Sequence, residues 1–158
     1  MSMELILMPK GSNKYVVEDK KQRLIYTIKK KGFGQKYNLI DTSNYVLYTI
    51  VQTGEDKKPA FSIILNDVTF LKMECKSLFL DPTITADGKN MKFALVSKDR
   101  HEFDITSDGE KVGHIKTKVT VGGELHYDIE IDNKFFDDYI PLFAVAIDKT
   151  FGDMNKKK

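Results

Sequence analysis

Short runs of alternating apolar and polar residues recur over most of the chain, up to about residue 132. A period of two is typical of strands with one buried face, and runs separated by turn residues every 8–12 positions are typical of an all-β domain. The pattern predicts twelve strands. Their expected ranges are Glu4–Met8, Tyr15–Val17, Leu24–Lys29, Tyr37–Ile40, Val46–Val51, Phe61–Leu65, Thr69–Glu74, Leu78–Leu80, Met91–Val96, Glu102–Thr106, Lys111–Val121 and Leu125–Ile131.

Turn-forming residues separate these runs, and none of the separators is long. Gly32–Gly34, Asp87–Gly88 and Gly122–Gly123 are examples, and Gly and Asp readily accept turn geometry. Because no low-complexity linker divides the chain, we expect residues 1–158 to form a single domain.

The last two predicted strands form a hairpin whose register follows from their alternation. A three-residue loop keeps the apolar faces of both strands on one side and places Val121 opposite Leu125. The outer face then carries opposite-charge pairs, each worth roughly a few tenths of a kcal/mol. The expected pairs are Lys118 with Asp128 and Lys116 with Glu130.

The segment Tyr139–Ile147 differs from everything before it, since it reads as a helix that is apolar on every face. Such a helix must be surrounded, and the only material that can surround it is the sheet formed by the preceding strands. The alanines within it, Ala144 and Ala146, indicate close packing. We therefore expect strands enclosing a helix.

The ends of this helix can also be predicted. Asp137 or Asp138 is suited to cap its N-terminus, and Pro141 falls in the first turn, where no donor is lost. Gly152 is suited to close its C-terminus. The prediction is a helix over about 139–151, followed by a flexible tail over 153–158.

Composition narrows the class of protein. The net charge is only +2, which gives no support to a nucleic-acid binder. A single cysteine rules out an internal disulfide and fits a reducing compartment. The apolar run at the N-terminus is interrupted by Glu4 and stopped by Pro9, so it does not read as a signal peptide. With no stretch of roughly 20 apolar residues, we predict a cytoplasmic protein, at most peripheral to a membrane.

Several stretches, in their order along the chain, resemble a known family. They are Tyr15–Asp19 with Leu24–Ile28, then Tyr37–Asp41, Phe93–Val96, His126–Ile131 and Leu142–Asp148. Together with a terminal helix after a dozen strands, they resemble the small LURP-one-related branch of the tubby C-terminal-like superfamily, which also includes the phospholipid scramblases. The resemblance covers nearly the whole chain. It implies a mainly β protein with a closed antiparallel barrel of about twelve strands around its C-terminal helix.

The chain also departs from relatives within that superfamily. The sequence shows neither the cysteine-rich palmitoylation segment nor the membrane-inserting tail of scramblase-like members, and it does not match the basic phosphoinositide site of tubby. Neither scrambling nor phosphoinositide specificity is therefore carried over to residues of this chain, and fold alone does not fix function.

Candidate chemistry outside this resemblance is sparse. His101, His114 and His126 share no metal-ligand spacing, and Cys75 has no identified base beside it. The alternating acids Asp128, Glu130 and Asp132 are explained by cross-strand lysines more simply than by calcium, which needs about six or more converging oxygens. We expect no catalytic group, no metal and no cofactor, and hence a non-enzymatic protein.

The most informative polar segment is the strand connection Lys29–Lys36, in which four lysines flank a phenylalanine. Such a tip can attract anionic headgroups while the ring enters the interface, with each lysine contributing on the order of 1 kcal/mol. Lysines also commonly protect sheet edges, or are simply solvated. The candidate binding residues are Lys29, Lys30, Lys31, Phe33 and Lys36.

Two functions follow as hypotheses. The first is a domain that binds anionic phospholipid or a membrane surface, assisted by the basic tail Lys156–Lys158. The alternative is a protein-interaction module without lipid affinity, using a barrel edge or loop. An enzyme is the third possibility, for which the sequence supplies no constellation of residues.

Overall fold

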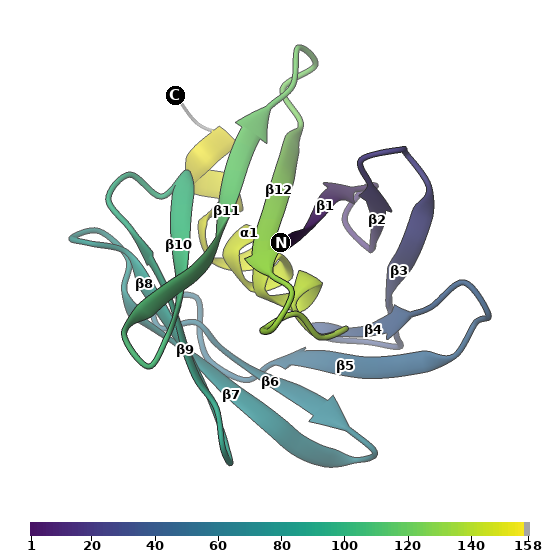
Figure 1. Cartoon of the computed structure of the whole chain (residues 1–158), viewed down its shortest axis with the longest axis horizontal. Coiled ribbons are helices and arrows are strands. Elements are labelled where there is room, and N and C mark those ends of the chain that lie inside the picture. Colours follow the sequence, from purple (N-terminus) through teal and green to yellow (C-terminus); the bar gives the residue numbers. More distant parts are fainter. Residues whose placement is uncertain (157–158) are drawn as a thin grey trace.

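The computed structural model describes residues 1–156, and it contains twelve strands and one helix. The strands form a closed antiparallel barrel in which each pairs with its neighbours in sequence and β1 pairs with β12 (Figure 1). The elements are β1 (Ser2–Pro9), β2 (Lys14–Asp19), β3 (Leu24–Lys30), β4 (Lys36–Ile40), β5 (Val46–Gln52), β6 (Ala60–Leu65), β7 (Val68–Ser77), β8 (Thr83–Gly88), β9 (Lys92–Ser97), β10 (Glu102–Ser107), β11 (Glu110–Val119), β12 (Leu125–Asp132) and α1 (Pro141–Lys156).

The predicted barrel is confirmed, with one strand misplaced. Leu78–Leu80, predicted as a strand, lies in the loop between β7 and β8. The strand that pairs there is β8, whose sequence offers only Ile84 and Ala86 to the core. Two small or medium apolar residues among threonines give a weak alternation, whereas the more apolar Leu78–Leu80 gives a stronger strand signal although it lies in a loop.

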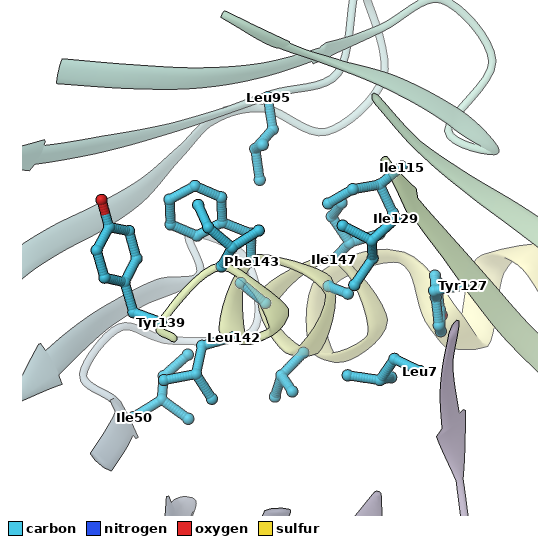
Figure 2. Packing of buried hydrophobic residues seen from close by; sticks show 14 of the residues in the cluster. Leu7, Ile50, Leu95, Ile115, Tyr127, Ile129, Tyr139, Leu142, Phe143 and Ile147 are labelled. Carbon is cyan, nitrogen blue, oxygen red and sulfur yellow. The ribbon is translucent and has the colours of Figure 1, made fainter. Parts of the chain in front are cut away.

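The helix α1 lies inside the ring of strands, so the core is one layer between helix and barrel wall (Figure 1). Alternate residues of every strand point inward, as in Leu5 and Leu7 of β1. Figure 2 shows Leu142, Phe143 and Ile147 of the helix among side chains from several strands. Every residue from Pro141 to Ile147 is buried, which accounts for a helix without a polar face.

The helix differs from the prediction at both ends. It begins at Pro141, and neither the Asp137 nor the Asp138 carboxylate accepts a hydrogen bond from an N–H group of the helix; instead the Asp138 carboxylate accepts one from the Tyr26 hydroxyl. Gly152 does not end the helix, which continues to Lys156. The expected tail is therefore helical over 153–156, and its last two residues lie outside the described part of the chain.

Gly152 has a packing reason rather than a capping one. A Cβ at this position would lie 2.8 Å from Asp148 Oδ1, the oxygen to which the Tyr127 hydroxyl donates. The glycine leaves room for that hydrogen bond on the preceding turn of the helix.

The register of the β11–β12 hairpin is also corrected. Val119, not Val121, lies opposite Leu125, so the connection runs from 120 to 124. Thr120 closes this longer loop, since its N–H donates to Glu124 O and its Oγ1 accepts from Glu124 N. The charge pairs change with it. Lys118 Nζ still lies 2.5 Å from Asp128 Oδ2 as a diagonal neighbour, whereas Lys116 Nζ lies 3.8 Å from Glu102 Oε1 on β10.

Because consecutive strands are antiparallel, the connections fall alternately at the two ends of the barrel. The helix starts at one end, after β12, and we call this the entry end. It finishes at the other, where Asn155 Nδ2 donates to Arg100 O, and we call this the exit end. The connections at the exit end are 10–13, 31–35, 53–59, 78–82, 98–101 and 120–124.

Candidate anion-binding surface

The β3–β4 hairpin carries all five candidate residues predicted from the sequence. Its loop closes through the Lys31 N–H, which donates to Lys36 O, with Gly32 and Gly34 at positive φ on either side of Phe33. These two glycines face open space, so the turn needs their backbone freedom and not a close approach. Phe33 itself is fully exposed, at 103%.

The lysines of this hairpin point in two directions. Lys29 and Lys36 are exposed on the outer side of the barrel wall, and Lys31 is exposed in the loop. Lys30 is half-buried and lies opposite Tyr37, whose side chain belongs to the inner face. The hairpin therefore presents positive charge both outside the barrel and at its mouth.

The β1–β2 hairpin adds charge that the sequence prediction missed. Asn13 O accepts from the Lys30 N–H, which fixes the two hairpins side by side. In the register of β2 with β3, Lys14 lies directly opposite Lys29. Residues 10–14 and 29–36 form what we call the lysine surface, which contains no acidic residue. Its lysines are Lys10, Lys14, Lys29, Lys30, Lys31 and Lys36.

Two observations describe the charge of this surface. Within residues 1–156, none of its six lysines lies within 4.0 Å of a carboxylate. Lys14 and Lys29 also form a like-charge cross-strand pair, which is destabilising. Protection of a sheet edge does not account for the lysines, because β3 and β4 are paired on both sides in a closed barrel.

Beneath the hairpin, the mouth of the barrel is closed by the helix. Lys149 Nζ donates to the Tyr37 hydroxyl at 2.7 Å and lies 4.7 Å from the centre of that ring. A hollow of about 10 Å³ remains between them, lined also by Gln35 and Gln52. That volume holds about one water molecule, so the lumen offers no room for an organic ligand there.

A buried polar cluster ties the helix to the wall near this end. Asp148 accepts hydrogen bonds from the Tyr15 hydroxyl at 2.7 Å and the Tyr127 hydroxyl at 2.6 Å. Burial raises the pKa of both tyrosines far above the ordinary value, and the Asp148 charge raises the pKa of each further. The hydroxyls thus stay protonated as donors, and the arrangement positions the helix.

The other sequence candidates lie apart from the lysine surface. Cys75 is buried in β7, its thiol donates to Ser77 O, and burial raises its pKa, which is the opposite of what a nucleophile needs. His114 Nε2 lies 3.5 Å from Glu130 Oε1 on the neighbouring strand. Within residues 1–156 no three His, Cys, Asp or Glu side chains gather as metal ligands.

Over the described residues, no helix combines the length and apolar character needed to cross a bilayer.

Comparison with known proteins gives two matches. The model of the LURP-one-related family matches residues 3–148. A protein of Arabidopsis thaliana, solved by X-ray crystallography, has a similar structure with a TM-score of 0.65 over 98% of this chain and 91% of that one. The two chains are 14% identical, so this likeness concerns the fold alone. No curated protein matches the chain.

Proposed function

The chain belongs to the LURP-one-related family, and from that premise we propose that it is a non-enzymatic domain that binds anionic phospholipid at a membrane surface. The observation that carries the proposal is the lysine surface. Within the described residues, six lysines without carboxylate partners lie on two hydrogen-bonded hairpins, one of which carries the exposed ring of Phe33.

The energetics favour a partner with dense negative charge. A folded protein gains nothing from placing Lys14 opposite Lys29, since each raises the electrostatic free energy of the other. An anionic bilayer supplies counter-charge to all exposed lysines at once, at about 1 kcal/mol for each. Phe33 adds apolar contact at the interface, and binding of this kind scales with buried apolar area plus electrostatic attraction.

The test is co-sedimentation of the wild-type protein with phosphatidylcholine vesicles, with and without phosphatidylserine, at low and moderate salt. We expect binding only to the anionic vesicles, weakened by salt because exposed charges are screened. Replacing Lys29, Lys30 and Lys31 by Glu should abolish it. Equal binding to both kinds of vesicle, or unchanged binding by the triple variant, would refute the proposal.

A protein-interaction module is the competing function. It would be indicated if a protein partner were recovered in a complex that the triple variant cannot form, while wild-type protein left anionic vesicles unbound.

A further inference from the structure

Exposed apolar side chains occur at the tips of three hairpins at the exit end. Phe33 lies on the β3–β4 hairpin and is 103% exposed; Phe79 and Leu80 lie on the β7–β8 hairpin at 72% and 87%. Val121, on the β11–β12 hairpin, is 110% exposed. Scattered apolar residues on a surface are ordinary, but at the exit end they stand at the tips of three separate hairpins, and one of these tips lies within the lysine surface.

The three hairpins are evenly placed around the barrel. In the strand order of the closed ring, they are every second connection at the exit end, so four strands lead from each to the next. At about 4.8 Å between neighbouring strands, successive tips are separated by roughly 19 Å along the wall. The tips therefore do not form one contiguous apolar patch.

Each tip is held outward by hydrogen bonds in its own loop. In the β7–β8 connection, the Ser77 hydroxyl donates to Leu80 O and Thr83 Oγ1 donates to Asp81 O at 2.7 Å. In the β11–β12 connection, the Thr120 N–H donates to Glu124 O at 2.8 Å. Ordered turns keep these side chains in solvent when they could otherwise fold back against the wall.

Basic side chains occupy the hairpins between the tips. The β1–β2 hairpin carries Lys10 and Lys14 with no acid. The other two intervening hairpins also carry acids. Their charged residues are Glu55, Asp56, Lys57 and Lys58 on β5–β6, and Lys98, Asp99 and Arg100 on β9–β10. Positive charge is thus greatest beside the tip that holds Phe33.

We propose that the exit end is a three-point docking surface for an anionic bilayer. Phe33, Phe79 with Leu80, and Val121 enter the interfacial region, while the lysine surface contacts the headgroups. Three separated points define a plane, so the contact fixes the orientation of the barrel and turns the C-terminal end of α1 toward the membrane. This inference rests on the proposed function and adds the face, the orientation and the inserting residues.

A bilayer fits this arrangement better than a protein partner does. The energetic centre of a protein interface is a compact cluster of well-packed side chains. Isolated apolar tips separated by polar hairpins lack such a centre, whereas a lipid interface accepts each tip independently.

The entry end supplies matched controls, because it also has exposed apolar residues. Tyr45 is 71% exposed in the β4–β5 connection and Val68 is 67% exposed at the start of β7. Each follows an acidic turn residue of its hairpin, Asp41 or Asp67.

The test places an environment-sensitive fluorophore at single cysteines. The variants are Phe33→Cys, Leu80→Cys and Val121→Cys, with Tyr45→Cys and Val68→Cys as controls, and the wild type reports background labelling of the buried Cys75. With vesicles of phosphatidylcholine and phosphatidylserine, we expect a blue shift at all three tips and none at either control. Unlabelled Leu80→Ser and Val121→Ser should each lose about tenfold in vesicle affinity.

Each other result overturns the inference. A shift at Phe33 alone, with Leu80→Ser and Val121→Ser binding as wild type, would leave the lysine surface as a lipid site but reject three-point docking. Shifts at Tyr45 or Val68 would place the wrong end against the bilayer. If the unlabelled wild type fails to bind anionic vesicles, both this inference and the proposed function are rejected.

Discussion

Asp148 is the residue on which the position of the helix most depends. It accepts two hydrogen bonds from tyrosines on the two strands that flank β1, Tyr15 on β2 and Tyr127 on β12. Hydrogen bonds to a charged acceptor are worth about 1.5–3 kcal/mol, and donors left buried without an acceptor cost about 1–3 kcal/mol each. A polar side chain therefore fixes the depth of an otherwise apolar helix.

The first prediction concerns Gly152 and its contact with Asp148. Alanine is ordinarily about 1 kcal/mol better than glycine within a helix. Here Gly152→Ala should lower the free energy of unfolding, because its Cβ would lie 2.8 Å from Asp148 Oδ1 and displace the carboxylate from Tyr127. In an Asp148→Ala background, the same substitution should raise the free energy of unfolding by about 0.5–1 kcal/mol. Urea unfolding of the four proteins measures the cycle, and equal stabilisation in both backgrounds would refute the contact.

The second prediction is a loss of stability at alkaline pH. An unfolded tyrosine loses its proton near pH 10, whereas burial raises the folded-state pKa of Tyr15 and Tyr127 well above that. The stability that these two tyrosines contribute is fully present below about pH 10, and it is lost as the pH rises toward their folded-state pKa values. The free energy of unfolding should fall there by about 1.4 kcal/mol per pH unit for each such tyrosine.

Urea unfolding at a series of alkaline pH values measures this slope. Tyr127→Phe should make this slope shallower by the contribution of one titrating group, about 1.4 kcal/mol per pH unit. Tyr45→Phe is the control, since Tyr45 is 71% exposed, and it should leave the slope unchanged. An unchanged slope in Tyr127→Phe would contradict the assignment.

At the scale of the element, α1 is enclosed on every side over Pro141–Ile147. Ala144 and Ala146 are completely buried, which places them where the wall comes closest to the helix. We predict that Ala146→Trp lowers the free energy of unfolding by about 3 kcal/mol or more, because there is no volume for the larger side chain. Asp153→Trp puts the same side chain on an exposed position of the same helix and should cost less than about 0.5 kcal/mol. Thermal denaturation compares the two, and similar losses would contradict enclosure.

Sequence reasoning recovers most elements because their signals are local. Alternation predicts eleven of the strands, and the apolar segment around Phe143 predicts an enclosed helix. It fails where two solutions satisfy the same pattern. A shift of two residues in the β11–β12 register keeps every side chain on its face, so alternation alone cannot separate Val119 from Val121 as the partner of Leu125. The predicted helix end at Gly152 is wrong because the glycine is needed there for the close approach of the Asp148 carboxylate and not for a C-terminal cap.

The candidate site is predicted in part for the same reason. The β3–β4 tip with Phe33 is visible as one short segment, whereas Lys10 and Lys14 join it only through the pairing of β2 with β3. The apolar tip at Leu80 was interpreted as a strand, since apolar residues in a short run favour that reading. Its exposure follows only from the loop in which it lies.

For the whole molecule, the residues that stabilise the fold lie inside the closed barrel, whereas the proposed binding residues lie in loops at one end. The interior is filled by the helix with its side chains, such as Leu142 and Phe143 (Figure 2). A partner can therefore be bound only on the outside of the barrel, for example at the loops of its two ends. The two ends differ in charge pattern, because the lysine surface at the exit end has no acidic residue within it, whereas Lys20 and Arg23 of the basic entry-end connection 20–23 pair with Glu4 and Asp19. If the proposed binding surface is correct, substitutions at the exit end should change vesicle binding with little effect on stability.

The most direct test of this account compares charge reversal at the two ends. One variant replaces Lys29, Lys30 and Lys31 by Glu at the exit end; its control replaces Lys21, Lys89 and Lys134, which are exposed at the entry end. Both change the net charge by the same amount. In co-sedimentation with phosphatidylserine vesicles, we expect the exit-end variant to lose binding and the entry-end variant to retain it. Equal loss in both variants would show that only overall charge matters, and would contradict a docking surface at the exit end.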